Sequence, residues 1–330
     1  MKIFQSSQKV ESTAPNQLRL DHRVYANLKQ LVTLEGFAQG LSFLPKFAVH
    51  SILSGRHSSR LRGRGLDFEE LRDYRVGDDI RSLDWKVSNR TRKPHVRVHS
   101  EERERDVLLL VDQRSCMFFG SQSQMKSVTA VELAALAAWR VLSVKDRVGA
   151  LVFNDHSIEM IKPQRSRTNV MRILHQLVSM NHQLNTQISD PSPAQLDCVL
   201  LDAVRLCKHD YLLFLISDLN GWSRQSLEYI QRIKAHNDVI VACVTDPLES
   251  QLPKLDQMVV SNGQLQIQVD TQSGSIADQF SAARNSKTAE LEAALKKSDI
   301  PLLNIDTVSP VYQQLLNAIG MKNFKPLGME

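Results

Sequence analysis

The chain has 330 residues, a net charge of +5 and 42% hydrophobic residues, which suits one large domain or two smaller ones around a sizeable core. A net charge this small argues against an extended nucleic-acid-binding surface. No apolar run approaches the roughly 18 residues that span a bilayer, and residues 1–17 lack the apolar stretch of a secretory signal. A cytoplasmic protein is therefore expected.

The first residues, 1–20, are polar, and we expect them to be flexible. Residues 22–50 carry apolar side chains at helical spacing, which predicts one or two short helices. The four cysteines, Cys116, Cys198, Cys207 and Cys243, lack zinc-knuckle spacing and are expected to be reduced, mostly in the core. The sequence thus gives no sign of disulfides or a zinc knuckle.

Residues 54–105 form a segment dense in charge, with 14 Lys or Arg and 10 Asp or Glu, a net of +4. Mixed signs at this density favour internal ion pairs over a phosphate track. Apolar and polar residues alternate around Leu83–Trp85 and Val96–Val98, which predicts two short strands. Gly77-Asp78-Asp79 has the composition of a turn.

From residue 107 onward, buried strands alternate with helices, as in a parallel sheet covered on both faces. A hairpin is expected over 258–269, turning at Asn262-Gly263. The expected strands are 107–111, 148–153, 157–161, 211–216, 239–244 and 301–305. The expected helices are 124–143, 166–180, 194–208, 223–235, 276–297 and 310–319.

Two stretches together resemble a known bacterial family. They are GRGLDFEELRDYRVGDDIRSLDWKVSNR (Gly63–Arg90) and EERERDVLLLVDQRSCM (Glu101–Met117). Both are similar to the family called domain of unknown function 58, which joins such a charged segment to a von Willebrand factor A-like domain. The resemblance extends from about Ser54 to the C-terminal helix. It implies a doubly wound α/β fold with a mostly parallel sheet and helices on both faces.

The resemblance also implies a domain plan and a partner. After the N-terminal residues 1–20, a helical lead-in and charged segment would span 21–105, and the von Willebrand factor A-like domain 106–330. Family members are commonly associated with MoxR-type AAA+ ATPases, which are regarded as chaperone-like remodelling machines. Many members carry membrane-spanning segments before the charged region. This chain shows none there, which implies a soluble member.

Von Willebrand factor A domains often hold Mg²⁺ or Mn²⁺ through an Asp-x-Ser-x-Ser loop, a threonine and a third-loop aspartate. By resemblance, Asp112 and Asp218 match the two aspartates, whereas Arg114 and Cys116 stand at the serine positions. Hard cations prefer oxygen ligands, so a positive charge and a thiol are poor replacements. Ser115 is one place out of register, and for the threonine the weak candidates are Thr186 and Ser192.

We therefore expect no bound metal, with Arg114 neutralising Asp112 and Asp218, the weak candidate ligands. The rim of this degenerate site still lies where open α/β sheets bind ligands, so it is the expected partner-binding region. It comprises Asp112, Arg114, Ser115, Cys116 and Asp218.

The charged segment has two interpretations. One interpretation is a phosphate-binding loop, because three arginines lie beside glycines: Arg60, Arg62 and Arg64. Against it, several acidic residues follow immediately in the sequence. We favour a structural network of arginine–carboxylate pairs. In this interpretation Asp84-Trp85 lies in a strand held in place by the network, and the Trp85 side chain packs inside the fold. The expected network is Arg62, Arg64, Asp67, Glu70, Arg72, Tyr74, Asp78, Asp79, Asp84 and Trp85.

The sequence shows no nucleophile elbow, Walker loop, dinucleotide fingerprint or HExxH motif. His57, His95 and His99 lack a common helical face, so metal ligation by them is not expected. The preferred function is a non-catalytic adaptor that docks a MoxR-type ATPase or its client. Two alternatives stay open: a metal-dependent hydrolase using Asp112 and Asp218, and a weak nucleic-acid binder acting through Arg60–Arg64.

Overall fold

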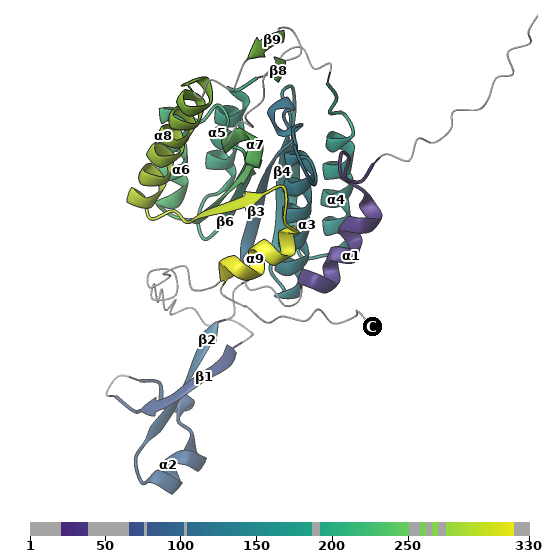
Figure 1. The fold of residues 1–330 in the computed structure, drawn as a ribbon. Coiled ribbons are helices and arrows are strands. Elements are labelled where there is room, and N and C mark those ends of the chain that lie inside the picture. Colours follow the sequence, from purple (N-terminus) through teal and green to yellow (C-terminus); the bar gives the residue numbers. More distant parts are fainter. Residues whose placement is uncertain are drawn as a thin grey trace, which may run out of the picture.

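A computed structural model describes residues 21–38, 66–75, 78–101, 104–186, 192–250, 258–261, 266–269 and 275–319. Its centre is a six-stranded sheet with the order β10-β7-β6-β3-β4-β5 (Figure 1). The strands are β3 Asp106–Asp112, β4 Arg147–Phe153, β5 Ile158–Gln164, β6 Leu212–Ser217, β7 Asp238–Thr245 and β10 Leu302–Asp306. All six correspond to predicted strands.

Five of the six strands run parallel, and β5 pairs antiparallel with β4 at one edge. β5 follows β4 through a short turn over residues 154–157, and a connection that short can only join antiparallel neighbours. The expected mostly parallel α/β sheet is therefore confirmed, with one antiparallel edge.

Successive residues of the central strand β3 enter opposite cores. Leu109 and Val111 belong to one hydrophobic cluster, while Leu108 and Leu110 belong to the other. Because side chains alternate across a strand, a strand covered on both faces must be apolar at every position. This explains the uninterrupted apolar run that predicted β3.

Helices cover both faces of the sheet (Figure 1). The first core contains residues of α1 Leu28–Ala38, α3 Lys126–Ser143, α4 Arg167–Asn181 and α9 Val311–Ile319. The second contains residues of α5 Gln195–Leu206, α6 Arg224–Lys234 and α8 Ser275–Lys297. All six helices predicted after residue 107 are present.

Helix α1 lies against the α/β layers, although it precedes the charged segment. It packs on α3 and α4, and the indole Nε1 of Trp139 in α3 donates to the carbonyl of Leu31 at 2.9 Å. The helix thus contributes Leu31 and Ala38 to the first core. The predicted helical region 22–50 is confirmed over α1, and residues 39–50 lie outside the described part.

A small hairpin unit stands apart from these layers in Figure 1. It consists of β1 Leu66–Asp73 and β2 His95–Glu101, paired antiparallel, with the short helices η1 Ile80–Ser82 and α2 Trp85–Thr91 between them. The strand predicted at Val96–Val98 is confirmed as β2. The strand predicted at Leu83–Trp85 is wrong, because Leu83 makes a single bridge to Val96 and Trp85 begins α2.

Two further strands, β8 Met258–Ser261 and β9 Gln266–Val269, pair antiparallel as predicted. The turn residues expected at Asn262-Gly263 lie outside the described part. A four-residue helix, α7 Pro247–Ser250, follows β7. Within the described residues, no helix combines the length and apolar content that crossing a bilayer requires.

Candidate functional site: a self-neutralised cluster at the sheet edge

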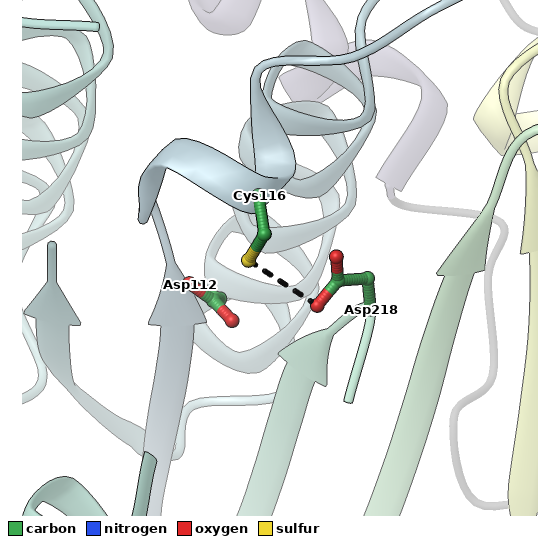
Figure 2. A group of neighbouring side chains, drawn as sticks. All are labelled: Asp112, Cys116 and Asp218. Carbon is green, nitrogen blue, oxygen red and sulfur yellow. Dashed lines mark hydrogen bonds between the residues drawn. The ribbon is translucent and has the colours of Figure 1, made fainter. Parts of the chain in front are cut away.

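The carboxyl ends of β3 and β6 meet at one edge of the sheet, since the two strands are parallel neighbours. Asp112 ends β3, and Asp218 directly follows β6. Both are buried, with Asp112 0% and Asp218 8% exposed. The structure therefore brings together the two aspartates that the sequence singled out (Figure 2).

Arg114 lies directly on the Asp112 carboxylate. Its Nε is 3.0 and 3.1 Å from the two carboxylate oxygens, and its Nη2 is 2.6 Å from Oδ2. The remaining guanidinium donors reach backbone carbonyls, Pro193 at 3.2 Å and Asn220 at 2.9 Å. The side chain is 1% exposed, so this charge is enclosed by the loops that it joins.

Ser217, the last residue of β6, completes the surroundings of Asp112. Its hydroxyl donates to Oδ2 of Asp112 at 2.6 Å and accepts the backbone N–H of Leu219 at 3.0 Å. Thr186 is exposed, whereas Ser192 gives its backbone N–H to Asp155. Neither of the two weak candidates for the threonine position contacts Asp112 in the described structure.

Lys126 is the functional residue that sequence analysis missed. It begins α3, is 1% exposed, and places Nζ 2.8 Å from Oδ2 of Asp218 and 2.5 Å from Oε1 of Glu249 in α7. A lysine at a helix N-terminus is unfavourable toward the helix dipole. A lysine at the start of an alanine-rich helix therefore indicates that acidic side chains lie nearby to compensate its charge.

The cluster thus contains its own countercharges. Three carboxylates, Asp112, Asp218 and Glu249, face the cations of Arg114 and Lys126. Burial opposes the charged form of Asp218, but Lys126 outweighs it and holds the pKa of that carboxyl below its ordinary value. Burial likewise opposes the charge of Lys126, yet the facing acids raise the lysine's pKa.

Cys116 points into the same cluster from the 3-10 turn η2 Ser115–Met117, and its thiol donates to Oδ1 of Asp218 at 3.5 Å (Figure 2). Burial, together with the charges of Asp112 and Asp218, raises the pKa of this thiol far above its ordinary value. The neighbouring Ser115 donates its backbone N–H to Asp155 at 2.7 Å. Cys116 is therefore a neutral thiol.

A divalent cation does not fit this set of side chains. One ligand atom each from Asp112, Cys116 and Asp218 can lie within 4.8 Å of the others, as a metal would need. However, Arg114 and Lys126 already bind the carboxylate oxygens, and Cys116 offers a protonated sulfur. Mg²⁺ and Mn²⁺ require several free oxygens. The guanidinium that we expected to neutralise Asp112 does contact it.

All four cysteines are free in the structure. Their placement is only half as predicted: Cys207 and Cys243 are buried, Cys116 is partly buried and Cys198 is exposed on α5.

Part of the predicted charge network exists in the hairpin unit. Arg72 binds both oxygens of Asp78, at 2.8 and 2.7 Å, and Asp79 accepts the backbone N–H of Arg81. Tyr74 contributes only a backbone hydrogen bond, donated to the carbonyl of Pro94, which is not part of an arginine–carboxylate network. Arg60, Arg62 and Arg64 lie outside the described residues, as does His57. Asp67, Glu70 and His99 belong to strands whose side chains are not described at these positions.

Two predictions about Asp84 and Trp85 are wrong. Asp84 is not in a strand; it caps α2, accepting the backbone N–H groups of Lys86 and Val87 at 3.0 and 3.1 Å. Trp85 is not a packing anchor, because it is 64% exposed. Trp85 is the first residue of the seven-residue helix α2, and its side chain faces solvent rather than the hairpin.

These features define a protein with an open α/β sheet in which buried cations hold the carboxylates at the ends of β3 and β6. The family model for the protein of unknown function DUF58 matches residues 70–290, and the chain belongs to this family. Uncharacterized proteins of Mycobacterium bovis and Mycobacterium tuberculosis are 26% identical over 276 residues, which is 81% of this chain and 83% of theirs.

Proposed function

We propose that this protein is a non-catalytic adaptor that works with a MoxR-type AAA+ ATPase in chaperone-like assembly or remodelling. The observation that carries the proposal is the Asp112–Arg114–Asp218–Lys126 cluster. In an open α/β sheet this edge is where substrates and cofactors bind. Here its carboxylates are held by internal cations, which supports a protein-binding scaffold over an enzyme.

We further propose that the α/β domain is von Willebrand factor A-like, with a degenerate metal-ion-dependent adhesion site. The positions of Asp112 and Asp218 at adjacent strand ends support this, as do the strand order and the Arg114 and Cys116 replacements. In this proposal, the role of the adhesion-site metal in neutralising the aspartates passes to Arg114 and Lys126.

A metal-dependent hydrolase is the weaker candidate. General base catalysis needs a group that can take up a proton near neutral pH. The pKa of Asp218 is lowered by Lys126, and Asp112 accepts four side-chain hydrogen bonds from Arg114 and Ser217. Both carboxylates are thereby committed to structural contacts.

The proposal is tested by direct binding. The purified protein and a MoxR-type ATPase from the same cell are combined with nucleotide present, first in a pull-down and then in a calorimetric titration. A saturable complex supports the adaptor role. If neither method detects a complex, the adaptor proposal is wrong.

A further inference from the structure

The tip of the hairpin unit, residues 78–94, presents large apolar side chains to solvent. Ile80 in η1 is 62% exposed, and Trp85 at the start of α2 is 64% exposed. Helix α2, which begins at Trp85, lies at the end of the unit that Figure 1 draws farthest from the sheet. Ile80 and Trp85 are five positions apart in the chain, on two consecutive short helices of the same unit. Neighbouring exposed apolar groups, unlike single scattered ones, indicate an interaction site.

The same tip carries five exposed basic side chains. All five are exposed, and within the described part of the chain none of them forms an ion pair; they are Arg81, Lys86, Arg90, Arg92 and Lys93. The tip also has three acids, each of which makes a contact within the unit: Asp78 binds Arg72, Asp79 accepts the backbone N–H of Arg81, and Asp84 caps α2. The surface of the tip is therefore positive although its composition is mixed.

Helix geometry places tryptophan and cations together. Residues four apart lie on the same side of a helix, so Trp85 aligns with Asn89, and Lys86 aligns with Arg90 in the adjacent row. All four are exposed. Ser88 contacts the hairpin, because its hydroxyl accepts the backbone N–H of His95 at 2.9 Å. Lys86 and Arg90 lie on the side of α2 away from Ser88 and are exposed.

We propose that this tip is the docking surface for the partner, and that the partner presents an acidic protein surface with an apolar pocket. The inference rests on the adaptor function proposed above and names where that contact is made. Trp and Arg are the residues most enriched at the energetic centres of protein interfaces. Arginine fits carboxylates with two parallel hydrogen bonds, which supports an acidic protein face.

Two other occupants fit less well. Single-stranded nucleic acid would stack on Trp85, but the exposed aliphatic side chain of Ile80 offers no stacking surface. Membrane-surface helices bury a long apolar face, whereas α2 has only seven residues. The rim around Asp112 also fits a charged partner less well, because Arg114 and Lys126 are buried and occupied.

The test measures the affinity of a purified MoxR-type ATPase, with nucleotide, for the full chain and its variants. We expect Trp85→Ala to weaken the complex about tenfold or more. The double change Arg90→Glu with Arg92→Glu should slow association and abolish most of its salt dependence. Met160→Ala, 47% exposed on β5, and Arg224→Glu, 93% exposed beside a cavity that Asp218 also lines, are the matched controls and should bind normally.

A spectroscopic signal checks the same contact independently. Trp85 is the most exposed tryptophan, whereas Trp139 is buried. Complex formation should shift the tryptophan emission to shorter wavelength, and Trp85→Phe should remove that shift. Circular dichroism and the melting temperature should be unchanged in each variant, because the altered side chains are exposed.

The possible failures are distinguishable. A complex weakened by Arg224→Glu but unaffected by the tip variants would overturn the tip as docking surface and leave the adaptor function standing. No complex at all would overturn both. Saturable binding of phosphatidylglycerol vesicles or single-stranded RNA at about 150 mM salt, lost in Trp85→Ala, would assign the tip to that ligand and overturn a protein partner.

Discussion

The guanidinium of Arg114 and the carboxylate of Asp112 form a fully buried pair, with three nitrogen–oxygen distances between 2.6 and 3.1 Å. Arg114 is two residues from Asp112 and folds back over the strand end that carries it. Three loops meet at this pair, because Arg114 also reaches the carbonyls of Pro193 and Asn220. The pair therefore holds these loops together at the edge of the sheet.

Removing the Arg114–Asp112 ion pair should strongly destabilise the protein. Arg114→Met removes the countercharge and leaves Asp112 buried without it, which costs about 3–5 kcal/mol of unfolding free energy. Urea denaturation measures the effect. Arg205→Ala, an exposed arginine on α5, is the control and should change stability by less than about 0.5 kcal/mol. A loss below about 1 kcal/mol for Arg114→Met would contradict the structural role.

Metal binding should be absent in the natural protein and recoverable in part. We expect no rise in melting temperature with Mg²⁺ or Mn²⁺, and no affinity better than roughly millimolar. Arg114→Ser with Cys116→Ser should create an Asp-x-Ser-x-Ser loop and give some metal-dependent stabilisation. Because Lys126 still binds Asp218, adding Lys126→Ala should increase that stabilisation.

Calorimetry with each metal decides between these outcomes. Micromolar binding by the natural protein, abolished by Asp112→Ala, would show that a cation displaces the internal charges.

The Asp218–Lys126 contact should make stability depend on acid pH. The pKa of Asp218 is lowered in the folded protein, so its stabilising contribution is complete above the unfolded value of about 3.9 and is lost as pH falls toward the folded value. Unfolding free energy should therefore decline below about pH 4 less steeply in Asp218→Asn than in the natural protein. Equal slopes in a pH series of urea titrations would refute this.

Thiol reactivity should follow exposure. Cys198 is exposed, whereas burial raises the pKa of Cys116 and raises that of Cys207 to about 12. The thiolate is the reactive form, so iodoacetamide at neutral pH should label Cys198 first. Mass spectrometry locates the label, and Cys198→Ser should remove the fast phase. Rapid labelling of Cys116 in the folded protein would contradict the cluster described here.

The cap of α2 should control order at the hairpin tip. Asp84→Ala removes the acceptor for two backbone N–H groups, which costs about 1 kcal/mol. Hydrogen exchange should accelerate about fivefold at the α2 amides and stay unchanged in β3. If exchange accelerates throughout the sheet as well, the tip and the α/β layers unfold together.

Much of the fold was predictable because its strands and helices are strongly patterned. β3 is apolar at every interior position, because both faces of this strand are buried and neither can expose a polar side chain to water. Since parallel neighbours end at one edge, the pairing of Asp112 with Asp218 also followed from the sequence once the strands were recognised. The expected contact of Arg114 with Asp112 is confirmed, but Asp218 is held mainly by Lys126, which the sequence did not single out.

The sequence could not decide contacts between distant segments or the exposure of short elements. Lys126 and Glu249 are 123 positions apart, and only the packing of α3 beside α7 brings their charges together. Likewise, Leu83–Trp85 alternates like a strand, but seven residues are too few for periodicity to reveal α2. Whether Trp85 faced a core or solvent depended on which side of that helix β2 covers, which tertiary packing alone determines.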